Sequence, residues 1–207
     1  MIALNKDIIK ELYYNCSIEY FSPEVKPILD QITISKSYDD LVFKFSLEKI
    51  LTELPEKFNE NREKGENESY LCQLIRNDSI VDFIKYVNKL NLPLNSTIDL
   101  SIYETNYFLI SRSKYPNTIQ LIEYSTFYGS IQIFNYLRMN HVELTPSLWL
   151  YAIHSNSAEM IHLLEENHVE PEIKSYVFCL KVSIQCFHNE IANYIRDTLF
   201  SVEECIK

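Results

Sequence analysis

The sequence of 207 residues is very poor in glycine, with only Gly65 and Gly129 present, whereas average usage predicts about 14. Phosphate-binding loops of the G-x-x-x-x-G-K or G-x-G-x-x-G type need several glycines, as does the G-x-S-x-G turn of many hydrolases. Collagen and glycine-turned β-hairpin arrays are excluded for the same reason. No short motif in the sequence therefore points to a reaction.

Basic charge is also scarce, since 19 Lys and Arg residues stand against 29 Asp and Glu and give a net charge of −10. Nucleic acid is not an expected partner, because binding to a phosphate backbone depends on clustered Lys and Arg. The acids are concentrated in residues 120–177, where seven of them face only Arg138 and Lys174. This excess favours a basic protein partner, and the alternative is an acidic surface that is merely solvated.

Long apolar runs and a basic-then-apolar N-terminus are both missing, so neither a membrane span nor a secretory signal is expected. The cysteines are odd in number and scattered, which favours reduced, mostly buried thiols over a disulfide framework. These features predict a cytoplasmic, intracellular protein. The five cysteines are Cys16, Cys72, Cys179, Cys186 and Cys205.

The chain divides by composition at residues 55–68, which are nearly all polar. Before this segment, apolar residues recur at helical spacing over residues 1–52. We therefore expect an N-terminal helical segment at 1–68 and a second part at 69–207, with the polar stretch as a helix end plus loop or a short linker.

A repeated pattern occupies the second part. The motif Asn-His-Val-Glu at residues 140–143 recurs 27 positions later at residues 167–170. The same offset aligns Gly-Ser at 129–130 with Asn-Ser at 156–157, and a fainter copy begins at Asp78. A period near 30 residues is typical of stacked arrays, in which each unit buries its apolar side against its neighbours.

Each unit is predicted to form two short antiparallel helices. In the best-defined copy, Thr145 and Pro146 open the first helix, and residues 148–153 supply its apolar face. Trp149 lies on this face and is expected to be buried. Ser157 follows the turn and offers its hydroxyl to the amides of the second helix.

The turns between paired helices are predicted to share one position for small or polar residues. Gly-Ser at 129–130, Asn-Ser at 156–157 and His-Asn at 188–189 occupy it in three copies. Asn140 and Asn167 are expected to end the second helices, where a left-handed or capping residue is needed, because asparagine tolerates the left-handed conformation.

Residues 128–143 resemble the second half of an ankyrin repeat, usually written G-H-x-E-I-V-x-x-L-L-x-x-G-A-D. The sequence here is Tyr-Gly-Ser-Ile-Gln-Ile-Phe-Asn-Tyr-Leu-Arg-Met-Asn-His-Val-Glu. More closely, residues 69–199 resemble a divergent ankyrin-like domain of unknown function found at the N-terminus of expanded protist ankyrin-repeat families. The matching runs are 122–124, 127–132, 143–154, 162–167 and 189–195.

Two departures from ordinary ankyrin repeats change the expected binding mode. The T-P-L-H-x-A box is not reproduced, since Thr145 and Pro146 lie two residues early. His141 and His168 stand where the hairpin glycine belongs. We therefore expect helix pairs more clearly than projecting β-hairpins.

The histidines and cysteines are the candidate residues for metal binding or catalysis. His154, His162 and His168 lie near Glu165 and Glu166, but spacings of eight and six do not give the i, i+4 pair typical of helical zinc ligands. Cys179 and Cys186 are two helical turns apart and are expected to be core thiols. No local signature marks a nucleophile, so neither a metal, a cofactor nor a catalytic residue is expected.

The sequence thus predicts an all-α protein, with N-terminal helices packed on a short ankyrin-like solenoid of three to five helix pairs. The resemblance implies a non-catalytic protein–protein interaction or scaffold module. The alternatives are a cap of a longer ankyrin array or a self-associating domain, and, less favoured, a metal-dependent hydrolase. The residues expected to bind a partner are Asn140, His141, Glu143, Asn167, His168, Glu170 and Glu172.

Overall fold

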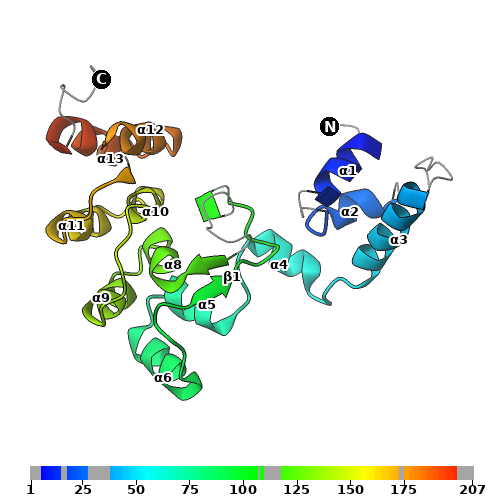
Figure 1. Cartoon of the computed structure of the whole chain (residues 1–207), viewed down its shortest axis with the longest axis horizontal. Coiled ribbons are helices and arrows are strands. Elements are labelled where there is room, and N and C mark those ends of the chain that lie inside the picture. Colours follow the sequence, from blue (N-terminus) through cyan, green and yellow to red (C-terminus); the bar gives the residue numbers. More distant parts are fainter. Residues whose placement is uncertain are drawn as a thin grey trace. The chain divides into compact units, whose positions relative to one another are not determined.

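The computed structural model of the chain consists mostly of helices and divides into two compact units (Figure 1). Unit 1 comprises residues Met1–Asn67 and Ser101–Thr105, and unit 2 comprises Glu68–Leu100 and Asn106–Lys207. Among the described residues, the only strands are β1 and β2, and no helix is long and apolar enough to cross a bilayer. The structure describes residues 6–14, 18–27, 38–106, 108–109, 118–172 and 175–199.

Within its described residues, unit 1 contains four α-helices and a small apolar core. The helices are α1 (Lys6–Tyr14), α2 (Ser22–Val25), α3 (Tyr38–Thr52) and α4 (Phe58–Lys64). The core is formed by Ile9, Ile18, Val25, Phe43, Leu47 and Leu51. The polar stretch that the sequence marks as a boundary forms α4, which ends at Gly65 in the left-handed conformation, with φ of 65°.

Residues 101–105 join unit 1 although they lie far along the chain. The rings of Phe58 and Tyr103 pack with centroids 5.6 Å apart, and both side chains are buried. The Asn67 amide donates a hydrogen bond of 3.0 Å to the Glu104 carboxylate, and these two side chains are also buried. The first segment of unit 1 thus ends at Asn67, one residue before the expected boundary. Unit 1 also includes residues 101–105, which belong to the second part of the sequence.

Unit 2 is built from four helix pairs within the described residues. The pairs are α5 (Tyr70–Arg76) with α6 (Ile80–Leu90), α8 (Leu121–Phe127) with α9 (Ile131–Met139), α10 (Leu148–Ser155) with α11 (Ala158–Glu166), and α12 (Val177–Gln185) with α13 (Asn189–Tyr194). A π-helical turn, Ile195–Leu199, extends α13. The two helices of each pair contact each other and are joined by a short turn, so they run antiparallel.

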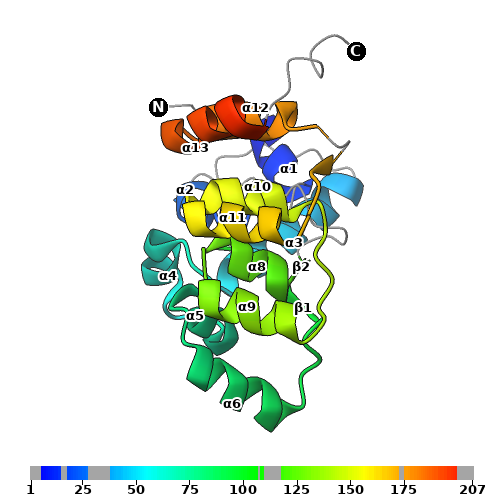
Figure 2. The same ribbon diagram turned by 90° about the vertical axis from the view of Figure 1, so that its left-hand side faces the viewer.

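The four pairs are stacked in sequence order, from α6 at the bottom of Figure 2 to α12 and α13 at the top. The first helices α5, α8, α10 and α12 contact one another in succession, and α6 contacts α9. Because α10 lies between α8 and α12, every residue from Leu148 to Ile153 is buried. Trp149 is fully buried, as predicted, and its Nε1 donates a 2.6 Å hydrogen bond to the Val169 carbonyl.

The turn within each pair contains a residue in the left-handed conformation, followed by the residue that precedes the second helix. These left-handed residues are Asp78, Gly129, Asn156 and Phe187. The fourth turn is therefore Phe187-His188, which lies 31 residues after Asn156-Ser157. The assignment of His188-Asn189 to this position is wrong by one residue. Ser157 caps α11 as predicted, since its Oγ accepts a hydrogen bond from the Met160 amide at 3.2 Å.

The connections between pairs differ from the prediction in one respect. Asn140 and Asn167 end α9 and α11, but their φ angles of −94° and −92° are ordinary. The left-handed residues are the following His141 and His168, at 63° and 54°. No strand occurs in the described parts of these two connections. The strands β1 (Thr97–Asp99) and β2 (Thr118–Gln120) pair antiparallel between α6 and α8, with Ile98 opposite Ile119.

Candidate binding surface

Two polar turns, which follow α9 and α11, contain all seven residues that the sequence selects for partner binding. The turns lie side by side, because an Arg138 guanidinium nitrogen donates a 2.9 Å hydrogen bond to Asn167 Oδ1. The same guanidinium also reaches Asn135 Oδ1 on α9, at 3.2 Å. The stack therefore presents the two copies of the Asn-His-Val-Glu motif as neighbours on one surface.

The asparagines of this set have a structural role. Asn140 Nδ2 donates to the Tyr136 carbonyl at 2.8 Å, and Asn167 Nδ2 donates to the Leu163 carbonyl at 2.7 Å. Each amide thus binds a carbonyl of the last helical turn, which has no partner within the helix. We expect substitution of either asparagine to affect stability as well as binding.

The remaining five residues present polar groups to solvent. The side chains of His141, Glu143, His168, Glu170 and Glu172 are all exposed. They provide three carboxylates and two imidazoles, which can accept hydrogen bonds and attract cationic groups. These turns can bind a polar partner without any rearrangement of the helices.

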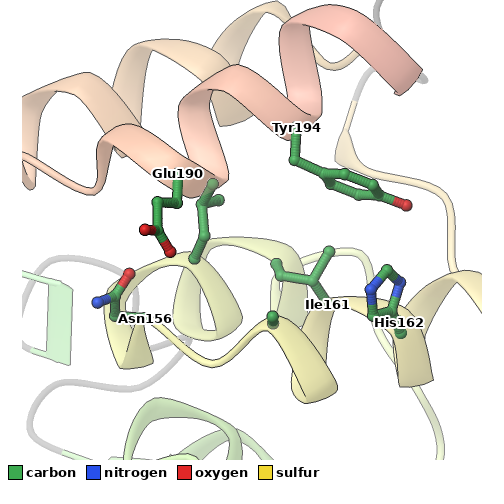
Figure 3. Close-up of a pocket in the computed structure, with 7 residues that line it drawn as sticks. Asn156, Ile161, His162, Glu190 and Tyr194 are labelled. Carbon is green, nitrogen blue, oxygen red and sulfur yellow. The ribbon is translucent and has the colours of Figure 1, made fainter.

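A pocket of about 170 Å³ opens between α11 and α13, on the same side of the stack as the second helices (Figure 3). Its lining residues are Asn156, Ala158, Ile161, His162, Glu190, Ile191 and Tyr194. Sequence reasoning did not select this site. The sequence indicates the site in one respect. Glu159-Met160 and Glu190-Ile191 align at an offset of 31 residues, which places an acid in the first turn of both second helices.

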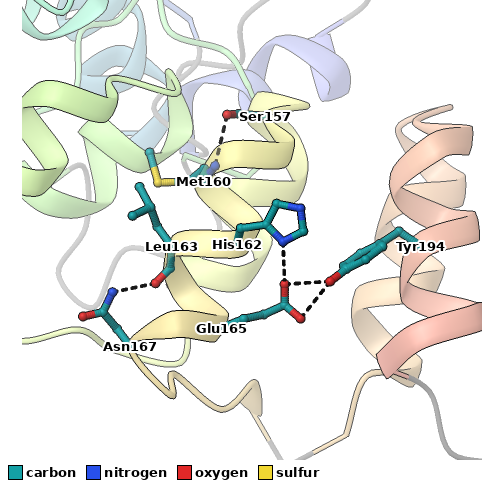
Figure 4. A network of polar contacts seen from close by, with 7 residues as sticks. All are labelled: Ser157, Met160, His162, Leu163, Glu165, Asn167 and Tyr194. Atoms are coloured by element: carbon teal, nitrogen blue, oxygen red, sulfur yellow. Dashed lines mark hydrogen bonds and ion pairs between the residues drawn. The ribbon is translucent and has the colours of Figure 1, made fainter.

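One wall of the pocket is held by a polar network between the two helices (Figure 4). The Tyr194 hydroxyl lies 2.9 and 3.1 Å from the two oxygens of the Glu165 carboxylate, to which it donates. His162 Nδ1 lies 3.0 Å from one of these oxygens, and the His162 and Tyr194 rings pack edge to face at 5.3 Å. Burial and the adjacent Glu165 carboxylate raise the pKa of the Tyr194 phenol, so Tyr194 stays a protonated donor.

The three histidines considered for a metal site are dispersed by the fold. His154 stacks on Phe127 with ring centroids 4.1 Å apart, and its Nε2 lies 2.8 Å from Asn106 Nδ2. Burial lowers the pKa of His154, and the nearby His188 lowers it further. His162 belongs to the Glu165 network and His168 to an exposed turn. Within the described ranges, no three His, Cys, Asp or Glu side chains are grouped as a metal site.

The cysteines of α12 differ in burial. Cys179 is buried, in agreement with its expected place in the core, whereas Cys186 at the end of the helix is only partly buried. Burial nevertheless raises the pKa of the Cys186 thiol. A raised pKa disfavours the thiolate, which is the nucleophilic form. Cys16 and Cys205 lie outside the described residues.

No protein-family model matches the sequence, and neither a curated protein nor a solved structure is significantly similar to the chain. The features of unit 2 that bear on function are therefore its exposed turns and its pocket.

Proposed function

We propose that the chain is a non-catalytic protein–protein interaction module whose unit 2 is a divergent ankyrin-like stack. Two observations support the ankyrin-like assignment. Four helix pairs stack in sequence order, and each pair turns through a left-handed residue at an equivalent position. The absence of strands from the described connections after α9 and α11 is the main departure from ordinary ankyrin repeats.

The observation that carries the proposed function is the pair of exposed turns at residues 140–143 and 167–172. Loops placed by a rigid scaffold are common binding sites, and the Arg138–Asn167 hydrogen bond holds these two together. Their acids, Glu143, Glu170 and Glu172, favour a partner with a basic surface.

The test is capture of partners by the full chain from a lysate of the cells that express it. The variant combines His141→Ala, Glu143→Gln, His168→Ala, Glu170→Gln and Glu172→Gln, and it keeps Asn140 and Asn167 because they cap helices. We expect the captured proteins to be lost while the melting temperature changes little. The matched control is a variant with Glu56→Gln, Glu60→Gln and Glu63→Gln, which removes the same number of exposed acids from unit 1.

Capture by the control variant should equal that by the native chain. If the turn variant captured the same proteins as the native chain, the turns would not be the binding surface. Equal losses in both variants would instead show that net charge, and not this surface, governs binding.

A second candidate function is self-association, or capping of a longer array, through the last helix pair. Val177, Phe178 and Ile184 of α12 are exposed, and Phe187 in the following turn is 85% exposed. A first helix in the middle of the stack, such as α10, is covered by the first helices of both neighbouring pairs. The helix α12 belongs to the last described pair, so its apolar surface can pack against a further helix. Sedimentation velocity over a range of concentrations tests this candidate, because a constant monomer mass would exclude self-association.

A further inference from the structure

The pocket between α11 and α13 combines an apolar floor with polar ends. The apolar lining residues, called the floor here, are Ala158 and Ile161 of α11 and Ile191 of α13; Ile161 and Ile191 are buried, and Ala158 is exposed. In Figure 3, Glu190 and Asn156 lie together at one end, and His162 and Tyr194 lie at the other. The pocket therefore suits an elongated group with an apolar middle and a polar tip.

The polar groups at the Glu190 end are available for a ligand. Within the described part of the chain, neither the Glu190 carboxylate nor the Asn156 side-chain amide has a hydrogen bond or an ion pair. Both side chains are exposed, so a ligand can reach them without displacing part of the protein. A carboxylate and an amide oxygen are both acceptors, which matches a ligand with several N–H donors.

The carboxylate that lines the pocket gives it acidic character. Glu190 lines it, and Glu165 forms part of its wall through the bond from Tyr194. No Lys or Arg is among its lining residues. An anion would be repelled here, and a wholly apolar group would leave Glu190 desolvated without a partner.

We propose that this pocket receives a lysine or arginine side chain from a partner protein. The aliphatic stem of the side chain would pack on Ala158, Ile161 and Ile191, since long basic side chains bury their methylene groups against apolar surface. The cationic head would pair with Glu190 and donate a second hydrogen bond to Asn156 Oδ1. This inference rests on the proposed function, because it names the residue type that a basic partner would insert.

The fixed Glu165–Tyr194 bond shapes the other end of the pocket. Because Tyr194 donates to Glu165, the two helices are joined across the pocket and its width is set before a ligand arrives. The Tyr194 and His162 rings lie at the end of the pocket opposite Glu190 and Asn156 (Figure 3). A preformed site loses less conformational entropy on binding than one that must close around its ligand.

The experiment is an NMR titration of the isotope-labelled full chain with small capped amino acids. The probes are Nα-acetyl-arginine amide and Nα-acetyl-lysine amide, with the citrulline and norleucine analogues as neutral counterparts of similar length. We expect the two cationic probes, and not the neutral ones, to shift the resonances of Ala158, Ile161 and Ile191 in a saturable way. The ratio of the arginine and lysine affinities then identifies the preferred head group.

Three pocket variants and one control variant separate binding in the pocket from general electrostatic attraction. Glu190→Gln should weaken binding of the cationic probes at least fivefold, whereas Glu166→Gln, an equal charge change at an exposed position outside the pocket lining, should change it less than twofold. Ala158→Leu fills the floor without changing any charge and should also weaken binding. Tyr194→Phe should weaken it by a smaller factor, because it removes only the hydroxyl that joins the two helices.

The proposal is overturned if the neutral probes bind as well as the cationic ones, if Glu166→Gln and Glu190→Gln weaken binding equally, or if Ala158→Leu has no effect. The probe titration needs no partner, so it is independent of the capture experiment. Pocket-specific probe binding without capture of any protein would contradict the proposed function and support the pocket. Capture of a partner that Glu190→Gln does not affect would contradict the pocket alone.

Discussion

Asp78 accepts a 3.0 Å hydrogen bond from the backbone amide of Ile133, a residue in the next helix pair. The second oxygen of the same carboxylate accepts a bond of 2.9 Å from the Gln132 amide. Asp78 is the left-handed residue of the α5–α6 turn, and Ile133 lies in the first turn of α9. One side chain thus binds free amides at the start of a helix in the neighbouring pair, where an acceptor is usually supplied by the residue that precedes the helix.

This contact predicts that Asp78→Ala destabilises unit 2 by about 1–2 kcal/mol, the usual effect of losing a helix N-cap and its hydrogen bonds. Asp78→Asn should cost less, because asparagine tolerates the left-handed conformation and its oxygen can still accept one bond. Urea unfolding followed by circular dichroism measures both changes.

Asp82→Ala is the matched control for Asp78, since Asp82 forms only an exposed ion pair with Lys85. Its expected cost is less than about 0.5 kcal/mol. An Asp78→Ala variant as stable as this control would show that solvent satisfies the α9 amides equally well.

The buried Trp149 leads to a second prediction. Its Nε1 donates to the Val169 carbonyl, and the ring packs edge to face on Tyr176 at 5.1 Å. Trp149→Phe would leave both a cavity and an unpaired buried carbonyl, so we expect a loss of about 2–4 kcal/mol in the free energy of unfolding. Phe178→Leu, at a position that is 39% exposed, should cost far less. If the two variants lost similar amounts of unfolding free energy, the Trp149 hydrogen bond would not contribute measurably to stability.

Local pattern was sufficient to predict several of these features. Apolar residues at helical spacing predicted the buried face at 148–153, and cap chemistry predicted the bond to the Ser157 hydroxyl. Both depend on residues within one helix and its ends, where sequence and structure are directly related. The mostly helical character of the described residues was predicted for the same reason, whereas the short strands β1 and β2 were not predicted.

Contacts between distant positions could not be predicted in this way. The Asp78–Ile133 bond, the Arg138–Asn167 bond and the Glu165–Tyr194 bond each join different pairs. These bonds depend on how one helix pair packs on the next, and the local sequence pattern of a single pair does not determine that packing. A left-handed or capping residue was expected at Asn140 and Asn167. Both asparagines cap their helices with ordinary φ angles, and the left-handed conformation occurs at the next residues, His141 and His168.

His154 gives a third prediction, on pH. Because burial lowers its pKa below the ordinary value of 6.5, the unfolded chain binds more protons than the folded one between these two pKa values. The free energy of unfolding should therefore fall as the pH is lowered through 6.5 and level off below the pKa of the folded state. Urea unfolding at about pH 7.5, 6.5 and 5.5 measures this decrease.

His154→Gln removes the titrating group and keeps a side chain that can hydrogen-bond to Asn106. Its stability should decrease less over this pH range than that of the native chain. His168→Gln, at an exposed turn, should behave like the native chain. An unchanged pH dependence in His154→Gln would assign the loss of stability to other groups.

Among the described residues with a left-handed conformation, Phe187 is the one with a bulky apolar side chain. It has φ of 59° in the turn between α12 and α13, and its side chain is 85% exposed. The equivalent turn between α8 and α9 has Gly129, at 69°. The left-handed conformation is disfavoured by about 1–2 kcal/mol for a residue with a Cβ atom. Glycine avoids this strain, but it lowers the folding stability by about 0.5–1 kcal/mol because it loses more conformational entropy on folding.

Phe187→Gly should therefore stabilise unit 2 by about 0.5–1 kcal/mol, because relief of the left-handed strain exceeds the entropy cost and little buried surface is lost. Phe187→Ala is the control, since it removes the ring but keeps the Cβ atom and should leave the stability nearly unchanged. Thermal unfolding of both variants measures the difference. If glycine were no more stabilising than alanine, the strain at Phe187 would be negligible. If sedimentation also shows self-association of the native chain, loss of that association in both variants would explain why an exposed aromatic residue occupies a strained position.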